Sequence, residues 1–214
     1  MRLIVRAIVR ASDADLVGSD DVIAIRAGDL AALASPVEAT VSASESALRG
    51  HDALTRTIHE RVASLPARFG QVFESESEVV AAIGPRAAML REAIEEVSGR
   101  VEVAITLRWR TPPEPVLTGA ATPGHLYMEQ RAADLRVRAL AQRLGERLVE
   151  EMACERAHVR LKTCPRPGVA AIVAVLIDRD AVTDARERVL SFGARSREVT
   201  ATVDGVFAPY SVAS

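Results

Sequence analysis

The chain has 214 residues, of which 49% are hydrophobic and 26% are charged, a composition typical of a globular protein. The formal net charge of −2 provides no general attraction to nucleic acid, so we expect no nucleic-acid partner. The longest apolar run, Val169–Ile177, is far shorter than the roughly 20 residues of a membrane-spanning helix. Residues 1–10 alternate arginines with apolar residues and so lack the apolar core of an export signal. With only two cysteines there is no sign of a disulfide framework, and we expect a cytoplasmic protein without a membrane anchor.

The first part of the chain predicts three strands. Leu3–Val9 is almost continuously apolar, which indicates a strand in the middle of a sheet. Val22–Arg26 and Leu30–Ala34 flank a turn signal at Ala27–Asp29, and this pattern predicts a β-hairpin. Ser35-Pro36 is expected to end the last of these strands.

Two helical patterns follow the predicted hairpin. Ser44 is a candidate N-cap for a helix that runs to about Ser64, with apolar residues recurring on one face. Ser75, with Glu78 three residues later, has the pattern of a capping box for a second helix. Gly84-Pro85 interrupts that helix and predicts a kink or two shorter pieces.

One more strand closes the predicted N-terminal domain, and the elements after it predict a second α+β region. Val101–Arg110 alternates apolar and polar residues and is the clearest strand of the chain. A proline-rich segment follows, so we expect an N-terminal domain at residues 1–111, a linker at 112–123 and a C-terminal domain at 124–214. The C-terminal domain is expected to contain these elements in order: a long helix at about 125–155, strands at 159–162 and 169–177, a helix at 180–192 and a strand at 199–203.

Signals for catalysis or metal binding are weak. The sequence has no dinucleotide or phosphate-binding loop, no zinc-protease motif and no nucleophile elbow, so we expect no enzyme activity, cofactor or catalytic residue. Cys154, His158 and Cys164 have a metal-like spacing, but a zinc site needs a fourth ligand, and a partly buried thiol with unrelated neighbours is the simpler interpretation. His51 lies on the apolar face of its helix, where a buried, hydrogen-bonded histidine is more common than a catalytic base.

The segment Leu65–Phe73, called the seam below, concentrates two phenylalanines, a glycine and an arginine between the two helical patterns. We expect Phe69 and Phe73 to anchor the helices to the sheet and Gly70 to allow close approach. Arg68 is expected to pair with Glu102 on the strand that follows, and an exchange of the two charges would test that pair. An anion-binding role for Arg68 is the alternative.

Four segments of the chain resemble motifs of the gas vesicle protein F/L family. The seam, LPARFGQVF, is similar to the family's "LPLRFGTVF". Gly99–Val103 is similar to its "GKVEW", Gly124–Arg131 to its "YLxxR" helix start, and Gly205–Ser211 to its closing "GPWPPYSF". The order and spacing match over nearly the whole chain, although Pro85 interrupts a helix that is continuous in the family and Phe207 replaces a tryptophan.

The resemblance implies a ferredoxin-like α+β N-terminal domain followed by a smaller α+β C-terminal domain with a long leading helix. It also implies an accessory or minor structural protein of gas vesicles, located in the cytoplasm at the vesicle. Its partners would be the major shell protein and other gas vesicle accessory proteins, with no membrane and no nucleic acid. A ligand-binding or enzymatic protein with a pocket near Arg68 is the alternative, because ferredoxin-like folds carry many functions.

Overall fold

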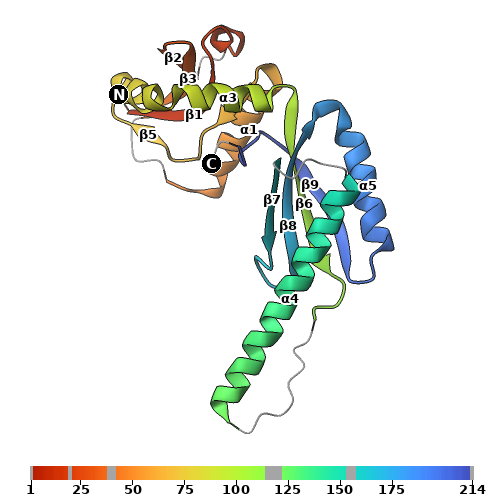
Figure 1. Cartoon of the computed structure of the whole chain (residues 1–214). Helices are drawn as coiled ribbons and strands as arrows, with labels where there is room; N and C mark the ends of the chain where they lie inside the picture. The colour runs from red at the N-terminus through yellow and green to blue at the C-terminus, as the bar shows by residue number, and fades with distance from the viewer. Residues whose placement is uncertain (1, 19–20, 38–41, 114–121, 153–157, 213–214) are drawn as a thin grey trace. The chain divides into compact units, whose positions relative to one another are not determined.

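The computed structural model describes residues 2–18, 21–37, 42–113, 122–152 and 158–212 (Figure 1). The chain divides into two compact units. Met1–Glu102 and Phe207–Ser214 form the first unit, and Val103–Val206 forms the second. Each unit contains an antiparallel sheet with helices, which confirms the predicted α+β class.

The sheet of the first unit has β1 at its centre, as the apolar run predicts. Its strands are β1 (Arg2–Arg10), β2 (Ile23–Ala27), β3 (Leu30–Val37), β4 (Ser64–Pro66) and β5 (Val72–Phe73). The order is β2-β3-β1-β4, and β5 also pairs with β1. The predicted hairpin is confirmed: β2 and β3 are antiparallel, and Gly28 in the turn has a φ of 67°. Strand β3 continues past the predicted end because Pro36 still pairs with Leu3, and a strand end tolerates the missing N–H of proline.

Among its described residues the first unit also has three α-helices: α1 (Glu45–Arg61), α2 (Glu76–Ile83) and α3 (Ala87–Val97). Both predicted caps are confirmed, since Ser44 Oγ accepts from the amide of Ala47 at 3.2 Å and Ser75 Oγ accepts from that of Glu78 at 3.3 Å. A short 3-10 turn at Gly84–Arg86 separates α2 from α3, so the predicted interruption produces two helices. Helix α1 ends before Ser64 because the chain turns extended there to pair with β1.

The second unit follows a β-α-β-β-α-β order, the element order of ferredoxin-like folds. Its elements are β6 (Arg100–Trp109), α4 (Pro123–Met152), β7 (Val159–Thr163), β8 (Val169–Asp178), α5 (Val182–Arg195) and β9 (Val199–Phe207). The sheet order is β7-β8-β6-β9, and α4 and α5 pack beside each other against it (Figure 1). The resemblance implies the ferredoxin-like order for the N-terminal domain, whereas the structure has it in this unit.

The division between the units falls within β6. The proline-rich segment predicts a boundary at 112–123, of which 114–121 lie outside the described residues. In the structure β6 pairs with β8 and β9, so the strand expected to close the N-terminal domain belongs from Val103 onward to the second unit. Residues 207–214, expected in the C-terminal domain, group instead with the first unit.

Candidate functional site

Arg6 occupies an irregular position in the central strand of the first unit. The pairing of β1 with β3 shifts its register between Val5 and Ala7, so Arg6 is the extra residue of a β-bulge. Such a bulge turns its side chain away from the regular alternation of the strand. The Arg6 Nε donates to Ser35 Oγ at 3.0 Å, and its carbonyl accepts from the amide of Ala67 in the seam at 2.8 Å.

His51 on α1 links Arg6 to the seam. The ring is only 3% exposed, and its Nε2 lies 2.8 Å from the carbonyl oxygen of Ala67. Because a carbonyl only accepts, Nε2 carries the proton and donates, and Nδ1 accepts from Arg6 Nη1 at 3.0 Å. Burial lowers the pKa of His51, and the charge of Arg6 acts in the same direction, so the neutral ring is favoured. The expected buried, hydrogen-bonded histidine is present.

A cavity of about 610 Å³ opens beside these two side chains. Its polar lining includes Arg6, His51 and Ser35, and Asp21 also contributes. The apolar lining is provided by Ile4, Pro36, Val37, Leu54 and Phe69, and Ala47 and Gly50 of α1 complete it. The cavity thus combines the Arg6 guanidinium and the Asp21 carboxylate with several apolar side chains, and small-molecule sites commonly combine a few polar groups with an apolar wall.

Some residues of the seam have roles that differ from the expected ones. Phe69 is half-buried and meets the His51 ring edge to face, with centroids 5.5 Å apart, and Phe73 in β5 pairs with Leu3 of β1. Gly70 has a φ of 89°, and a Cβ there would meet no atom within 4 Å. A glycine is therefore required at this position by the backbone conformation and not, as the sequence suggests, by the close approach of another segment.

The expected ion pair between Arg68 and Glu102 does not form among the described residues. Arg68 is exposed and does not line the cavity. Glu102 is 8% exposed, and its Oε2 accepts from the backbone amide of Ser211 at 2.7 Å. The buried carboxylate is thus satisfied by the C-terminal segment, a partner more than one hundred residues away that spacing alone does not reveal.

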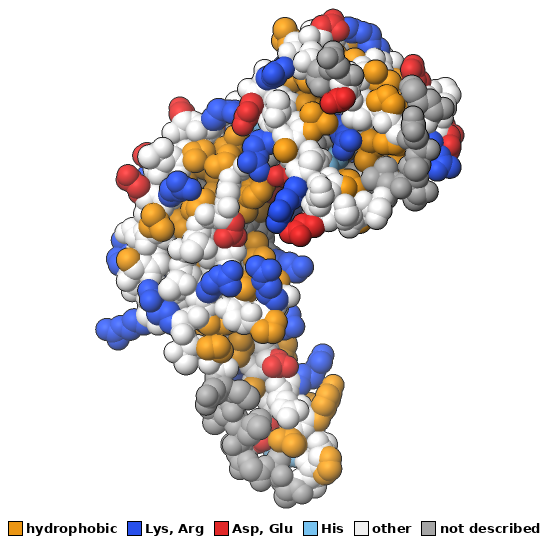
Figure 2. All heavy atoms as spheres, turned by 180° about the vertical axis from the view of Figure 1, so that it is seen from behind, with side chains coloured by type: hydrophobic (Ala, Val, Ile, Leu, Met, Phe, Trp, Pro, Cys, Tyr) orange, Lys and Arg blue, Asp and Glu red, His pale blue; other side chains and the backbone are white. Residues whose placement is uncertain are grey.

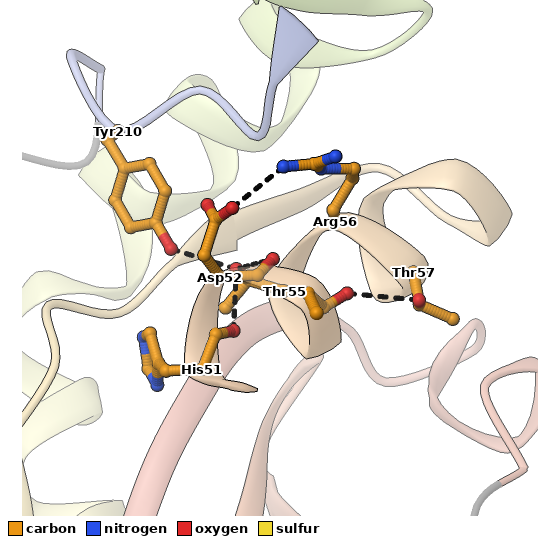
Figure 3. A network of polar contacts seen from close by, with 7 residues as sticks. His51, Asp52, Thr55, Arg56, Thr57 and Tyr210 are labelled. Atoms are coloured by element: carbon orange, nitrogen blue, oxygen red, sulfur yellow. Dashed lines mark hydrogen bonds and ion pairs between the residues drawn. The ribbon is translucent and has the colours of Figure 1, made fainter. Parts of the chain in front are cut away.

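The C-terminal segment also contacts α1 (Figure 3). Thr55 Oγ1 lies 3.0 Å from the carbonyls of His51 and Asp52, to which it donates, and 2.8 Å from the hydroxyl of Tyr210. The Tyr210 hydroxyl therefore donates to Thr55. The guanidinium of Arg56 stacks over the ring of Phe207 at 5.6 Å from its centroid. Helix α1 thus connects the seam with the closing motif, two of the segments that carry the family resemblance.

The N-terminal part of α4, residues 123–135, is called the α4 tip. In Figure 1 it extends past the strand ends of its own unit, and Figure 2 shows hydrophobic side chains on it. Its large apolar side chains are exposed: Leu126 by 37%, Tyr127 by 60%, Met128 by 63% and Leu135 by 60%. Apolar residues in a helix usually face a core, so sequence patterning alone does not mark this surface.

The described part of the chain contains neither a cluster of potential metal ligands nor a helix suited to span a membrane. Cys154 lies outside it, so the Cys154–His158–Cys164 spacing is not placed, and no cluster of three potential metal ligands occurs among the described residues. Within the same residues, no helix combines the length and apolarity needed to cross a bilayer.

Comparison with known proteins supports the resemblance found in the sequence. The model of the family described as gas vesicle synthesis protein GvpL/GvpF matches residues 4–213. The fold is similar to the crystal structure of the gas vesicle protein GvpF from Anabaena sp. PCC7120, with a TM-score of 0.80 and 18% identity over 100% of this chain and 96% of that chain. It is also similar to GvpF from Microcystis aeruginosa, with a TM-score of 0.79 and 18% identity over 100% of this chain and 99% of that chain. No curated protein sequence matches the chain.

Proposed function

The chain belongs to the gas vesicle synthesis protein GvpL/GvpF family, and on this premise we propose that it binds the major gas vesicle shell protein through the α4 tip. In this role the protein covers shell subunits before they assemble and supports vesicle growth without catalysing a reaction. Its place in the cell is the gas vesicle, with other gas vesicle accessory proteins as further partners. The observation that carries the surface assignment is the exposed apolar α4 tip.

The faces of α4 support this assignment. Residues seven apart lie two turns apart on the same face of a helix. Met128 and Leu135 are seven apart and both exposed, while the buried residues that face the sheet, such as Leu144 and Leu148, lie on another face. Leu126 precedes the buried Ala133 by seven residues and so extends the sheet-facing stripe beyond the part of the helix that the sheet covers. The α4 tip therefore offers apolar side chains on more than one side.

The strength of the contact follows from the exposed area. Full burial of a Leu or Met side chain contributes roughly 1.5–3 kcal/mol, so burial of the exposed part of each side chain at the tip contributes on the order of 1 kcal/mol. The cost of association offsets part of this gain. A contact of this size is reversible, which favours a transient assembly factor over a component fixed permanently in the shell.

The shell protein is a suitable occupant because the family resemblance implies a small hydrophobic protein, and exposed apolar strands need cover before they assemble. An amphipathic helix provides such cover when its apolar face docks against the partner. The alternative is a ligand-binding or enzymatic protein with a pocket near Arg68. A cavity does lie nearby, lined by His51 and Phe69, but Arg68 itself is exposed and lies outside its lining, so this alternative cannot depend on Arg68.

A pull-down with the full-length chain and the major shell protein tests the proposal. We expect the shell protein to be retained at both low and moderate salt, since apolar contacts are screened far less than ion pairs. An empty pull-down at both salt concentrations would contradict the proposal. Purified and washed vesicles separate the two modes of action: a reversible partner is lost on washing, whereas a fixed component stays.

A further inference from the structure

Arg6 carries a positive charge that no carboxylate in the described part of the chain neutralises. Its Nε and Nη1 donate to the hydroxyl of Ser35 and the ring of His51, both uncharged groups. Asp21, which has contacts of its own, also lines the cavity but forms no ion pair with Arg6. A half-buried guanidinium without a counter-charge is costly, since burial disfavours the charged form and lowers the pKa of Arg6.

The free donors of Arg6 are accessible from the cavity. Nη2 of Arg6 has no hydrogen-bond partner among the described residues. Every fully buried side-chain nitrogen or oxygen of these residues does have a partner. Nη2 is therefore not sealed in the core. Because the side chain is clamped by Ser35 and His51, a ligand anion meets a guanidinium that is already oriented, which reduces the entropy lost on binding.

The chemistry around Arg6 selects the kind of anion. One guanidinium supplies one charge, and the remaining N–H groups suit a planar carboxylate. A phosphate dianion would leave a second charge without a partner beside Leu54 and Phe69, where desolvation is costly. The apolar wall instead suits a hydrocarbon body, and the cavity of about 610 Å³ is within the range of small-molecule sites.

We propose that this cavity binds a monocarboxylate with an apolar body, whose carboxylate pairs with Arg6 and whose hydrocarbon part packs against Phe69, Leu54 and Ile4. The site lies in the first unit and goes beyond the proposed binding of shell protein by α4. The β-bulge at Arg6 is the feature that creates the site, because it turns the guanidinium toward Ser35 and His51.

The ligand class is tested by calorimetric titration of the full-length protein with 3-phenylpropionate, hexanoate and indole-3-acetate. We expect at least one acid to bind with a Kd on the order of millimolar or tighter, since small ligands of this size gain only a few kcal/mol. The neutral 3-phenylpropan-1-ol and inorganic phosphate are expected to bind at least about tenfold more weakly than the best acid. The proposal is overturned if no acid binds at a ligand concentration of about ten times a millimolar Kd. It is also overturned if the alcohol or phosphate binds as tightly as the best acid.

Gly50→Leu blocks the cavity without removing a polar partner. Gly50 lines the cavity, and a Cβ there meets no atom within 4 Å, so a leucine side chain has room to enter the space. The change also favours the helix, because Gly is about 0.8–1 kcal/mol less favourable than Ala and Leu is a strong helix former. We expect the affinity of the acid to fall at least about tenfold in Gly50→Leu and in Arg6→Gln.

Ala53→Leu is the matched control, since Ala53 is exposed on the same helix and does not line the cavity. Its affinity for the acid should stay within about twofold of the parent protein. Thermal unfolding of Gly50→Leu verifies that it folds, and NMR reports whether the His51 ring shifts on addition of the acid while the exposed His125 does not. Undiminished binding by folded Gly50→Leu, or a shift at His125 alone, places the acid elsewhere and refutes the site.

Discussion

The hydrogen bond between Tyr210 and Thr55 provides a direct measure of how firmly the C-terminal segment is held on α1. Tyr210→Phe removes one hydroxyl that donates to Thr55 Oγ1 over 2.8 Å in a partly buried position. A neutral hydrogen bond of this kind contributes about 1 kcal/mol to the free energy of unfolding. Thr55 keeps its own donation to the carbonyls of His51 and Asp52, so on the side of Thr55 the change removes only the contact with Tyr210.

A double-mutant cycle separates the contact from its surroundings. Thr55→Ala, Tyr210→Phe and the double variant are unfolded in urea, and we expect a coupling free energy of about 1 kcal/mol. The other tyrosine of the chain provides the control: Tyr127 is 60% exposed, so Tyr127→Phe should change the free energy of unfolding by less than about 0.5 kcal/mol. A coupling near zero would show that the segment is not bound to α1 through this pair and would refute the assignment.

Three further predictions concern titration and packing. Burial lowers the pKa of His51 below its unfolded value of about 6.5, so the unfolded state takes up the proton first as the pH falls. The contribution of His51 to the free energy of unfolding should therefore be constant above that pH and fall below it by up to about 1.4 kcal/mol per pH unit. Urea unfolding of His51→Gln should lack this part of the slope and His125→Gln should retain it; an unchanged slope in His51→Gln would contradict the prediction. Burial also raises the pKa of Tyr210, so ultraviolet titration should show its ionisation above about pH 10, with stability lost as the pH rises through that range; ionisation at the ordinary value would contradict the buried contact. Gly193→Ala should destabilise the protein by roughly 1–3 kcal/mol, because the added Cβ would lie 2.6 Å from the amide nitrogen of Ala201. Gly50→Ala, where the added Cβ meets no atom within 4 Å, should stabilise it by about 1 kcal/mol. The reverse order of stability in urea unfolding would refute the packing of α5 on β9.

Features set by neighbouring residues could be predicted from the sequence. The caps at Ser44 and Ser75 and the break at Gly84-Pro85 depend on contacts within one helical turn, and all three are confirmed. The α+β class and the central position of β1 follow from the periodicity and the long apolar run, and they are also confirmed.

Features set by distant residues could not be predicted in this way. Arg6 and His51 are 45 residues apart, and the bulge that turns Arg6 toward His51 has no local signature such as a glycine. Glu102 accepts a hydrogen bond from Ser211, which lies 109 residues later in the chain, whereas the sequence favours Arg68 as its partner because Arg68 is nearer. The exposure of the α4 tip could not be predicted either, because the sequence of an apolar helical residue does not show whether a sheet covers it.

The most direct test of the central claim measures the affinity of the major shell protein for a charged variant of the α4 tip. Met128→Glu combined with Leu135→Glu removes two side chains that are 63% and 60% exposed and should leave the fold intact. Leu190→Glu is the matched control, because Leu190 is 53% exposed on α5 of the same unit. We predict that the tip variant binds at least about tenfold more weakly, equivalent to about 1.4 kcal/mol, while Leu190→Glu binds like the parent chain. Equal affinity of all three proteins, or equal weakening by both variants, would contradict the role of the α4 tip.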